Sequence, residues 1–297
     1  MIRNLSRFVG VWVLGGLGNQ MFQYATAYAV ARRMDAQMRL DLSGFGSYSL
    51  RSFALSAFGI ESAQWEGACP AEGRRARLRE RWQVLADLGL APRPGYRLVR
   101  EQAFSYNPSL NELNESCYLY GYWQSPRYFD DFADDIRRIF DPARFESPRL
   151  ASALAELQGP RSVSVHLRRG DYSKSPAALA MHGLCDLDYY ERAAYLLRRC
   201  VPGCRFHIFS DDLEAAREMF AGWPDVSVME SRSQEDDLLL MSRCRHHIIA
   251  NSSFSWWAAW LDDRPDSLVV APRNWFARPR LVRTHVLDLF PDDWILL

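Results

Sequence analysis

Strand-like apolar runs that alternate with helical patterns limit the fold of this chain of 297 residues more than any other feature. An apolar run at residues 8–14 leads into a helical pattern from Met21, and residues 37–41 resemble a second strand. The alternation restarts in the second half, with strands expected at residues 162–167, 206–209, 226–229 and 247–250. Strands alternating with helices form parallel sheets covered by helices, so the sequence predicts an α/β fold with two Rossmann-like lobes.

Turn-forming residues place the boundary between these lobes near residue 155. Asp141-Pro and then Gln158-Gly-Pro are the kind of punctuation expected at a linker. We therefore predict a first lobe over residues 1–155 and a second over residues 156–297, with the last helix packing back on the first lobe.

Composition excludes several classes of protein. Lysine plus arginine equals aspartate plus glutamate at 36 each, so no overall positive field draws in nucleic acid. No apolar run reaches roughly 18 residues and no signal-peptide core is present, which predicts a cytoplasmic chain that does not span a membrane. Six cysteines lack paired spacing; Cys200-x3-Cys204 before His207 is a weak zinc pattern, and reduced thiols fit better.

The strand at residues 162–167 ends in a loop rich in charged side chains. Ligands of open α/β sheets bind just past the carboxyl ends of strands, and arginine forks match the oxygens of a diphosphate. The alternative is a surface turn closed by an ion pair between an arginine and the carboxylate. The candidates from this loop are His166, Arg168, Arg169, Asp171 and Tyr172.

The next expected strand ends in Ser210-Asp211-Asp212. One interpretation is helix capping, because an Asp before a helix accepts hydrogen bonds from its free backbone amides. Another is that one carboxylate accepts from a base such as guanine. A third, a metal site for a nucleoside diphosphate, is weaker, because the arginines already supply positive charge.

A third polar loop, residues 251–255, follows the strand at residues 247–250. Its hydroxyls and amide precede a helix whose free N–H groups and dipole attract anions, so the loop predicts a phosphate site. A serine-rich cap without a ligand is the alternative. The candidates are Asn251, Ser252, Ser253, Phe254 and Ser255, and the tryptophans that follow are expected in the core.

The first lobe has its own glycine loop, with Gly16-x-Gly18 after a strand and Asp41 at the end of the next strand. This invites a nicotinamide-dependent oxidoreductase, but Met21 is bulky where close helix–strand contact is needed. A loop that lets the amides of Asn19 and Gln20 approach a polyhydroxyl substrate fits as well.

Three blocks together, residues 15–25, 166–172 and 249–261, resemble the signature blocks of bacterial α-1,2-fucosyltransferases of glycosyltransferase family 11. The resemblance spans both lobes and omits residues 43–120. It implies a GT-B architecture, with two lobes whose parallel sheets face across a cleft. It also implies inverting, metal-independent transfer of L-fucose from GDP-β-L-fucose to the 2-hydroxyl of a terminal β-galactoside, with no cofactor.

The resemblance also implies roles for the candidate residues. Arg168 would contact the donor diphosphate, and His166 with an acid of the Ser-Asp-Asp turn, Asp212 in preference to Asp211, would contact the guanosine. The remaining assignments are phosphate binding by Ser252, Ser253 and Ser255, and a donor-sugar or acceptor side made by Gly16, Gly18, Asn19 and Gln20.

Some alternatives stay open. The general base is Asp171 or His166, unless Asp171 only orients Arg168. Competing functions are another sugar-nucleotide transferase, the oxidoreductase, and a non-catalytic carbohydrate- or nucleotide-binding module. The arginine-rich residues 74–81 predict either a solvated helix face or peripheral contact with an anionic membrane, where lipid-linked acceptors would lie.

Overall fold

The computed structural model describes residues 7–61, 65–66, 69–91, 95–170, 176–230, 233–277 and 286–297. The chain divides into two compact units: unit 1 is Met1–Ile139 with His285–Phe290, and unit 2 is Phe140–Thr284 with Pro291–Leu297. The change of unit lies earlier than the predicted boundary at residue 155. The reason is packing, because the ring of Phe140 lies edge-on to Trp257, 5.4 Å between centroids, inside unit 2.

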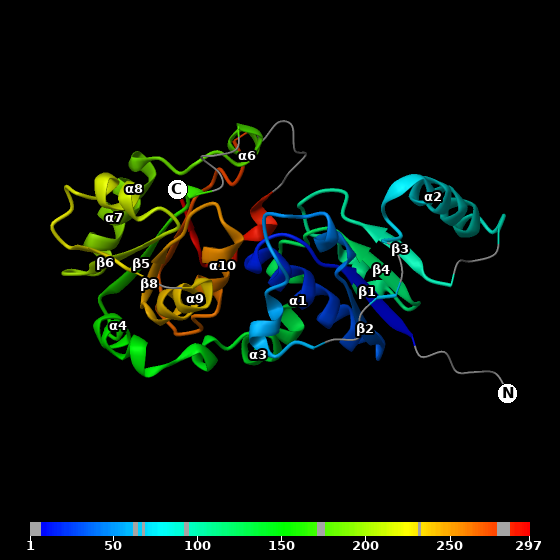
Figure 1. Cartoon of the computed structure of the whole chain (residues 1–297), viewed down its shortest axis with the longest axis horizontal. Coiled ribbons are helices and arrows are strands. Elements are labelled where there is room, and N and C mark those ends of the chain that lie inside the picture. Colours follow the sequence, from blue (N-terminus) through cyan, green and yellow to red (C-terminus); the bar gives the residue numbers. More distant parts are fainter. Residues whose placement is uncertain are drawn as a thin grey trace. The chain divides into compact units, whose positions relative to one another are not determined.

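Unit 1 is built on a four-stranded parallel sheet in the order β2-β1-β4-β3 (Figure 1). Helix α1 follows β1 and ends at Asp35, which takes the left-handed conformation common at helix ends. The strands are β1 (Phe8–Trp12), β2 (Gln37–Asp41), β3 (Arg97–Arg100) and β4 (Cys117–Tyr120); the helices are α1 (Leu17–Met34), α2 (Gly73–Asp87) and α3 (Ala133–Ile139), with the 3-10 helix η8 (Val286–Leu289).

Unit 2 contains a six-stranded parallel sheet in the order β10-β9-β8-β5-β6-β7. Counted from β5, this is the 3-2-1-4-5-6 order of doubly wound nucleotide-binding sheets. The strands are β5 (Ser162–Leu167), β6 (Arg205–Ser210), β7 (Val226–Val228), β8 (His246–Ile248), β9 (Val269–Ala271) and β10 (Ile295–Leu296). The helices are α4 (Ala151–Leu157), α6 (Pro176–His182), α7 (Leu187–Cys200), α8 (Leu213–Met219), α9 (Gln234–Arg243) and α10 (Ser253–Trp260). The predicted α/β class with two parallel sheets is confirmed.

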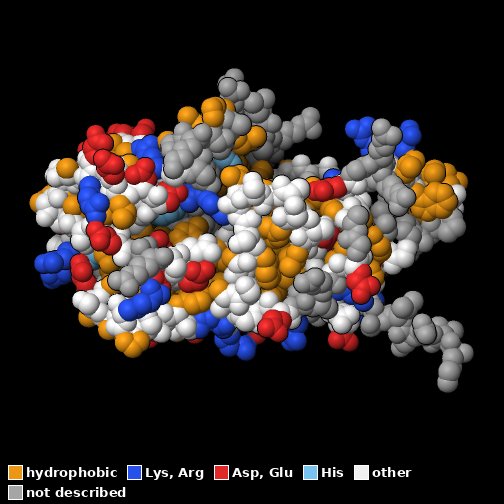
Figure 2. Space-filling view, viewed as in Figure 1, with side chains coloured by type: hydrophobic (Ala, Val, Ile, Leu, Met, Phe, Trp, Pro, Cys, Tyr) orange, Lys and Arg blue, Asp and Glu red, His pale blue; other side chains and the backbone are white. Residues whose placement is uncertain are grey.

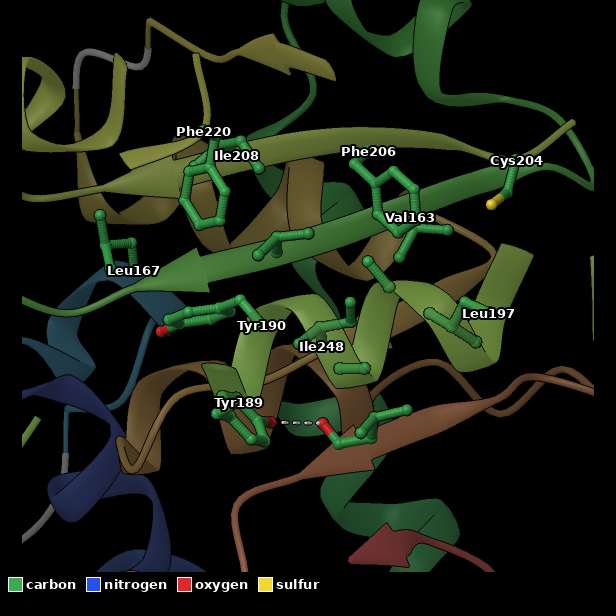
Figure 3. Close-up of a cluster of buried hydrophobic side chains, with 14 of the residues drawn as sticks. Val163, Leu167, Tyr189, Tyr190, Leu197, Cys204, Phe206, Ile208, Phe220 and Ile248 are labelled. Atoms are coloured by element: carbon green, nitrogen blue, oxygen red, sulfur yellow. Dashed lines mark hydrogen bonds between the residues drawn. The ribbon is translucent and has the colours of Figure 1, made fainter. Parts of the chain in front are cut away.

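Two tyrosines of α7 fix the carboxyl ends of the central strands. Tyr190 donates to the backbone oxygen of His166 at 2.8 Å, directly before the arginine loop. Tyr189 donates to the oxygens of Ile249 at 2.7 Å and Val270 at 3.2 Å. Both rings lie in the apolar cluster between α7 and the sheet (Figure 3). The same packing that forms the core therefore sets where the loops after β5 and β8 begin.

The tryptophans of α10 belong to the core, as predicted. Trp256 and Trp257 have no exposed surface, and Trp260 is 7% exposed. Among the helices that the structure describes, none combines the length and the apolar composition needed to cross a membrane.

Candidate functional site

Three polar loops meet at one edge of the unit 2 sheet. Strand β5 pairs with β6 on one side and with β8 on the other, so the loops that leave their carboxyl ends are neighbours. The chain order reverses between β5 and β8, which is where doubly wound sheets bind their ligands. The pairing of the strands therefore brings these three loops together within unit 2.

The centre of this edge is an ion pair between Arg168 and Asp211. The guanidinium Nη1 lies 2.8 Å from Oδ2 of Asp211, and both side chains are largely buried, at 18% and 27% exposed. The other oxygen of Asp211 accepts from the backbone N–H groups of Arg169 at 2.9 Å and Gly170 at 3.0 Å. One carboxylate therefore fixes both the arginine side chain and the loop that carries it.

The charge of Asp211 is stabilised by these contacts. Burial alone would raise the pKa of its carboxyl group, but the charge of Arg168 and the two backbone donors lower the pKa below its usual value. The carboxylate is therefore ionised at neutral pH, and its ion pair with Arg168 persists there.

The backbone at Gly170 lies directly against this carboxylate. A Cβ atom at this position would overlap Oδ2 and Cγ of the Asp211 carboxylate. A side chain at this position would therefore force the carboxylate of Asp211 or the loop to shift.

The other two residues of the Ser-Asp-Asp turn hold local structure. The Ser210 hydroxyl donates to the oxygen of Leu167 at 2.9 Å and accepts from the N–H of Asp212 at 3.0 Å. The Asp212 carboxylate accepts from the N–H of Ala215 at 3.1 Å and caps α8. The capping interpretation therefore describes Asp212, whereas Asp211 is the acid that faces the arginine loop; a guanosine contact by either stays a prediction.

His166 lies at the carboxyl end of β5 and is 4% exposed. Burial, helped by the nearby charge of Arg168, lowers its pKa to about 3, so the ring is neutral near pH 7. Its Nδ1 is buried and has no hydrogen-bond partner among the described residues. The ring lies 5.8 Å from that of Phe254, between centroids. An unsatisfied buried nitrogen at this edge is suited to a ligand's hydrogen bond.

Of the other arginine-loop candidates, Arg169 contacts Asp211 through its backbone N–H, whereas its side chain lies against α8. The Arg169 guanidinium lies 3.8 Å from the sulfur of Met219 on α8. Asp171 and Tyr172 fall outside the described residues.

The loop after β8 begins with a structural amide. The side-chain nitrogen of Asn251 donates to the backbone oxygens of His182 at 2.8 Å and Trp275 at 3.4 Å, which ties two distant segments together. Ser252 occupies the N-cap position of α10, and no side chain caps that helix. Ser255 donates to the oxygen of Ser252 at 3.2 Å. Ser253 and Phe254 lie in the first turn, at the positive end of the α10 dipole; phosphate binding by this loop stays a prediction.

In unit 1, the two amide side chains next to the glycine loop differ in role: Gln20 holds the local backbone, whereas Asn19 lies at the predicted binding edge. Gln20 is fully buried: its nitrogen donates to the oxygens of Gly15 at 2.8 Å and Ser52 at 2.9 Å, and its oxygen accepts from the N–H of Ala54 at 2.9 Å. Asn19 instead accepts from the side-chain nitrogen of Gln124 at 2.8 Å. Gly16 is the N-cap of α1 and Gly18 lies buried in its first turn.

Sequence reasoning missed two residues near this loop. Glu101 follows β3 and accepts from the N–H groups of Tyr122 at 2.7 Å and Trp123 at 3.0 Å, and burial raises its pKa to about 7. Gln124, 7% exposed, follows β4 and has a buried side-chain oxygen without a hydrogen-bond partner in the described structure. Recognition of β3 and β4 as parallel strands would have flagged both, since each residue lies just past a carboxyl end.

Asp41 is not placed as a dinucleotide-binding acid. Its carboxylate accepts from the Tyr118 hydroxyl at 2.5 Å and from the N–H of Ser43 at 2.9 Å, and it is 1% exposed. The oxidoreductase interpretation therefore lacks its ribose-binding group. No cluster of three or more His, Cys, Asp or Glu side chains able to hold a metal occurs in the described part of the chain.

The family follows from comparison with known proteins. Residues 93–297 match the model of Glycosyl transferase family 11. The chain belongs to this family, as its resemblance predicted, and is therefore a glycosyltransferase. An alpha-1,2-colitosyltransferase of Escherichia coli is 34% identical over 95% of this chain and 96% of the relative.

Other similar proteins are also named as glycosyltransferases. The O-antigen biosynthesis glycosyltransferase WbnK of Escherichia coli is 33% identical over 95% of this chain and 98% of its own length. Galactoside alpha-(1,2)-fucosyltransferase 2 of Oryctolagus cuniculus is 26% identical over 85% and 67%. Among solved structures, NodZ alpha-1,6-fucosyltransferase soaked with GDP-fucose is a distant likeness, with TM-score 0.44 and 15% identity over 86% of this chain and 92% of that one.

Proposed function

We propose that this glycosyltransferase moves L-fucose from GDP-β-L-fucose to the 2-hydroxyl of a terminal β-galactoside, with inversion and without a metal ion or other cofactor. The observation that carries the proposal is Arg168 held by Asp211 at the carboxyl end of β5, in a family-11 chain. The α-1,2 linkage is supported because relatives named for two different sugars share it.

Arg168 acts on the leaving group. Departure of GDP from the anomeric carbon places negative charge on the β-phosphate, and a guanidinium aimed there stabilises the transition state more than the ground state. The ion pair with Asp211 fixes the guanidinium before the donor binds, so little reorganisation is needed when the charge develops. The positive end of α10, with Ser252 and Ser253, lies on the neighbouring strand's loop and supports the second phosphate contact.

His166 suits recognition of the base better than proton transfer. A ring with a pKa of about 3 binds a proton too weakly to serve as an efficient general base near neutral pH. Its unpartnered Nδ1 can instead form one hydrogen bond to the nucleotide. Asp171 stays the proposed base, and a strongly dissociated sugar would need little deprotonation of the acceptor.

A second candidate donor is GDP-colitose. The colitosyltransferase relative is 34% identical to this chain, against 26% for the rabbit fucosyltransferase. Colitose is fucose without its 3-hydroxyl, so the same phosphate and base contacts would serve either donor. The two donors would differ only in contacts at that hydroxyl.

The test is a donor and acceptor matrix with the purified protein. GDP-fucose, GDP-colitose, UDP-sugars and dTDP-sugars are each incubated with lactose, lacto-N-biose or N-acetyllactosamine, with and without EDTA. We expect transfer from GDP-fucose, unaffected by EDTA, with an α-1,2 linkage by NMR. Transfer from GDP-colitose alone would replace the sugar, and transfer from a UDP- or dTDP-sugar alone would overturn the proposed nucleotide. GDP binding without transfer or hydrolysis would favour the non-catalytic module.

A further inference from the structure

Exposed hydrophobic side chains are concentrated on helix α2 of unit 1 and on the residues just past its end. Of the eleven large hydrophobic residues that are exposed in the described part of the chain, six lie between residues 78 and 90. Solvent-facing helices usually present polar side chains, so this concentration calls for a partner surface. The six are Leu78 (66%), Trp82 (49%), Val84 (59%), Leu85 (41%), Leu88 (67%) and Leu90 (73%).

The orientation of α2 is set by a glutamine on its inner side. The side-chain oxygen of Gln83 accepts from the N–H of Leu98 at 2.9 Å, and its nitrogen donates to the Leu98 oxygen at 3.4 Å. Leu98 lies on β3, one of the two edge strands of the unit 1 sheet, so Gln83 pairs with this edge. Ala86, one turn further along this side, is 5% exposed.

The opposite side of α2 carries leucine and arginine together. With about 100° of rotation per residue, Leu78, Arg81 and Leu85 lie opposite Gln83. Arg77 and Arg81 are exposed. Figure 2 shows hydrophobic side chains gathered over α2, with basic side chains next to them. We call this the α2 face: Arg77, Leu78, Arg81, Trp82, Leu85 and Leu88.

The charge of the segment selects the kind of partner. Residues 73–90 contain five arginines against two acids, Glu80 and Asp87, in a chain whose net charge is zero. Leucine and tryptophan beside arginine are typical of helices that lie in the interface of an anionic bilayer. A symmetric pair of chains would place these arginines against one another, which disfavours a second copy as the partner.

We propose that the α2 face docks on an anionic membrane surface, with its leucines and Trp82 in the acyl boundary and its arginines at the lipid phosphates. This inference stands apart from the transfer reaction. It favours the membrane interpretation of residues 74–81, because a purely solvated face would not expose four large apolar side chains, Leu78, Trp82, Leu85 and Leu88.

The experiment is flotation of the purified full-length chain with phosphatidylcholine vesicles, with and without phosphatidylglycerol. The unaltered chain should float with the anionic vesicles only, and added salt should weaken binding. L85S/L88S and R77Q/R81Q should each weaken binding by about tenfold or more. Arg192→Gln with Tyr195→Ser, exposed on α7, is the matched control and should bind like the unaltered chain.

Activity with a free disaccharide acceptor and the far-ultraviolet circular dichroism of each variant show that the fold is kept. Absence of binding to anionic vesicles would overturn the proposal, and so would equal loss in the control pair. Light scattering measures the molar mass of the chain and of L85S/L88S. If the unaltered chain is a dimer and L85S/L88S is a monomer, the face binds a second copy instead of a membrane.

Discussion

Arg168 and Asp211 come from the ends of two adjacent strands and meet at 2.8 Å. The pair depends on the register of β5 and β6, in which Leu167 lies beside Ser210, so that the residue after each strand faces the other. The sheet itself thus positions the residue proposed to draw GDP away from the sugar.

Arg168→Ala should reduce kcat by a factor on the order of 10² or more, because the charge that stabilises the departing phosphate is lost. Arg168→Lys should not restore it, since an ammonium cannot bind both Asp211 and a phosphate oxygen with a planar fork. Steady-state kinetics with GDP-fucose measures both, and Arg192→Ala on α7 is an exposed control. Near-normal turnover by the lysine variant would contradict this role.

Asp211→Asn and Asp212→Asn form a matched pair of adjacent substitutions. The first keeps an oxygen for the backbone donors but removes the charge that holds Arg168, so kcat should fall with little change in stability. The second keeps an N-cap oxygen for α8 and should leave turnover nearly unchanged. Kinetics and thermal unfolding of both variants decide the matter. Loss of activity in the Asp212 variant alone would instead support the guanosine contact that was predicted for Asp212 from the sequence.

Gly170→Ala should lower activity by displacing Asp211, although it adds and removes no charge. The new Cβ would displace the carboxylate from the loop and, with it, the guanidinium of Arg168. Gly222→Ala is the control, because nothing lies within 4 Å of a Cβ at that position. We expect at least about a tenfold loss of kcat in the first variant and none in the second. Equal activities would show that the loop adapts without consequence for Arg168.

The loops of the candidate site were predictable from the sequence, but the role of each residue within a loop was not. The β-branched strand before His166 and the Ser-Asp-Asp turn were recognisable from pattern alone. Whether Asp211 or Asp212 faces the arginines is decided by where β6 ends and α8 begins, a difference of one residue between identical side chains. Asn251 illustrates the same limit, because its carbonyl partners come from segments far away in the sequence.

Glu101 and Gln124 of unit 1 were harder to predict for a related reason. Strands β3 and β4 have four residues each, and the residues at the ends of β3 are arginines, so neither strand stands out by periodicity. Without them, Glu101 and Gln124 could not be placed at the end of a sheet.

The unfolding free energy should depend on His166 in acidic solution. Burial lowers its folded-state pKa to about 3, whereas the unfolded ring titrates near its ordinary value of 6.5. The unfolded state therefore binds the proton more tightly, so stability is present above pH 6.5 and is lost as the pH falls toward 3. We expect His166 to account for about 2 kcal/mol of the loss in unfolding free energy between pH 7 and pH 5.

His166→Gln should remove this part of the pH dependence, which urea unfolding at the two pH values measures. The buried rings of His207 and His247 also have lowered pKa values, so a smaller slope remains in the variant. An unchanged slope would contradict the buried, neutral state of His166.

Substitution of Gln20 should lower the stability of the fold, whereas substitution of Asn19 should weaken acceptor binding. Gln20→Ala leaves three backbone groups without their partners, and we expect about 3 kcal/mol less unfolding free energy. Asn19→Ala removes the hydrogen bond to Gln124 and should raise the KM for the galactoside, with little effect on stability or on GDP affinity. Urea unfolding, acceptor titration and GDP calorimetry distinguish the two variants. A change in GDP affinity in the Asn19 variant would move this loop to the donor side.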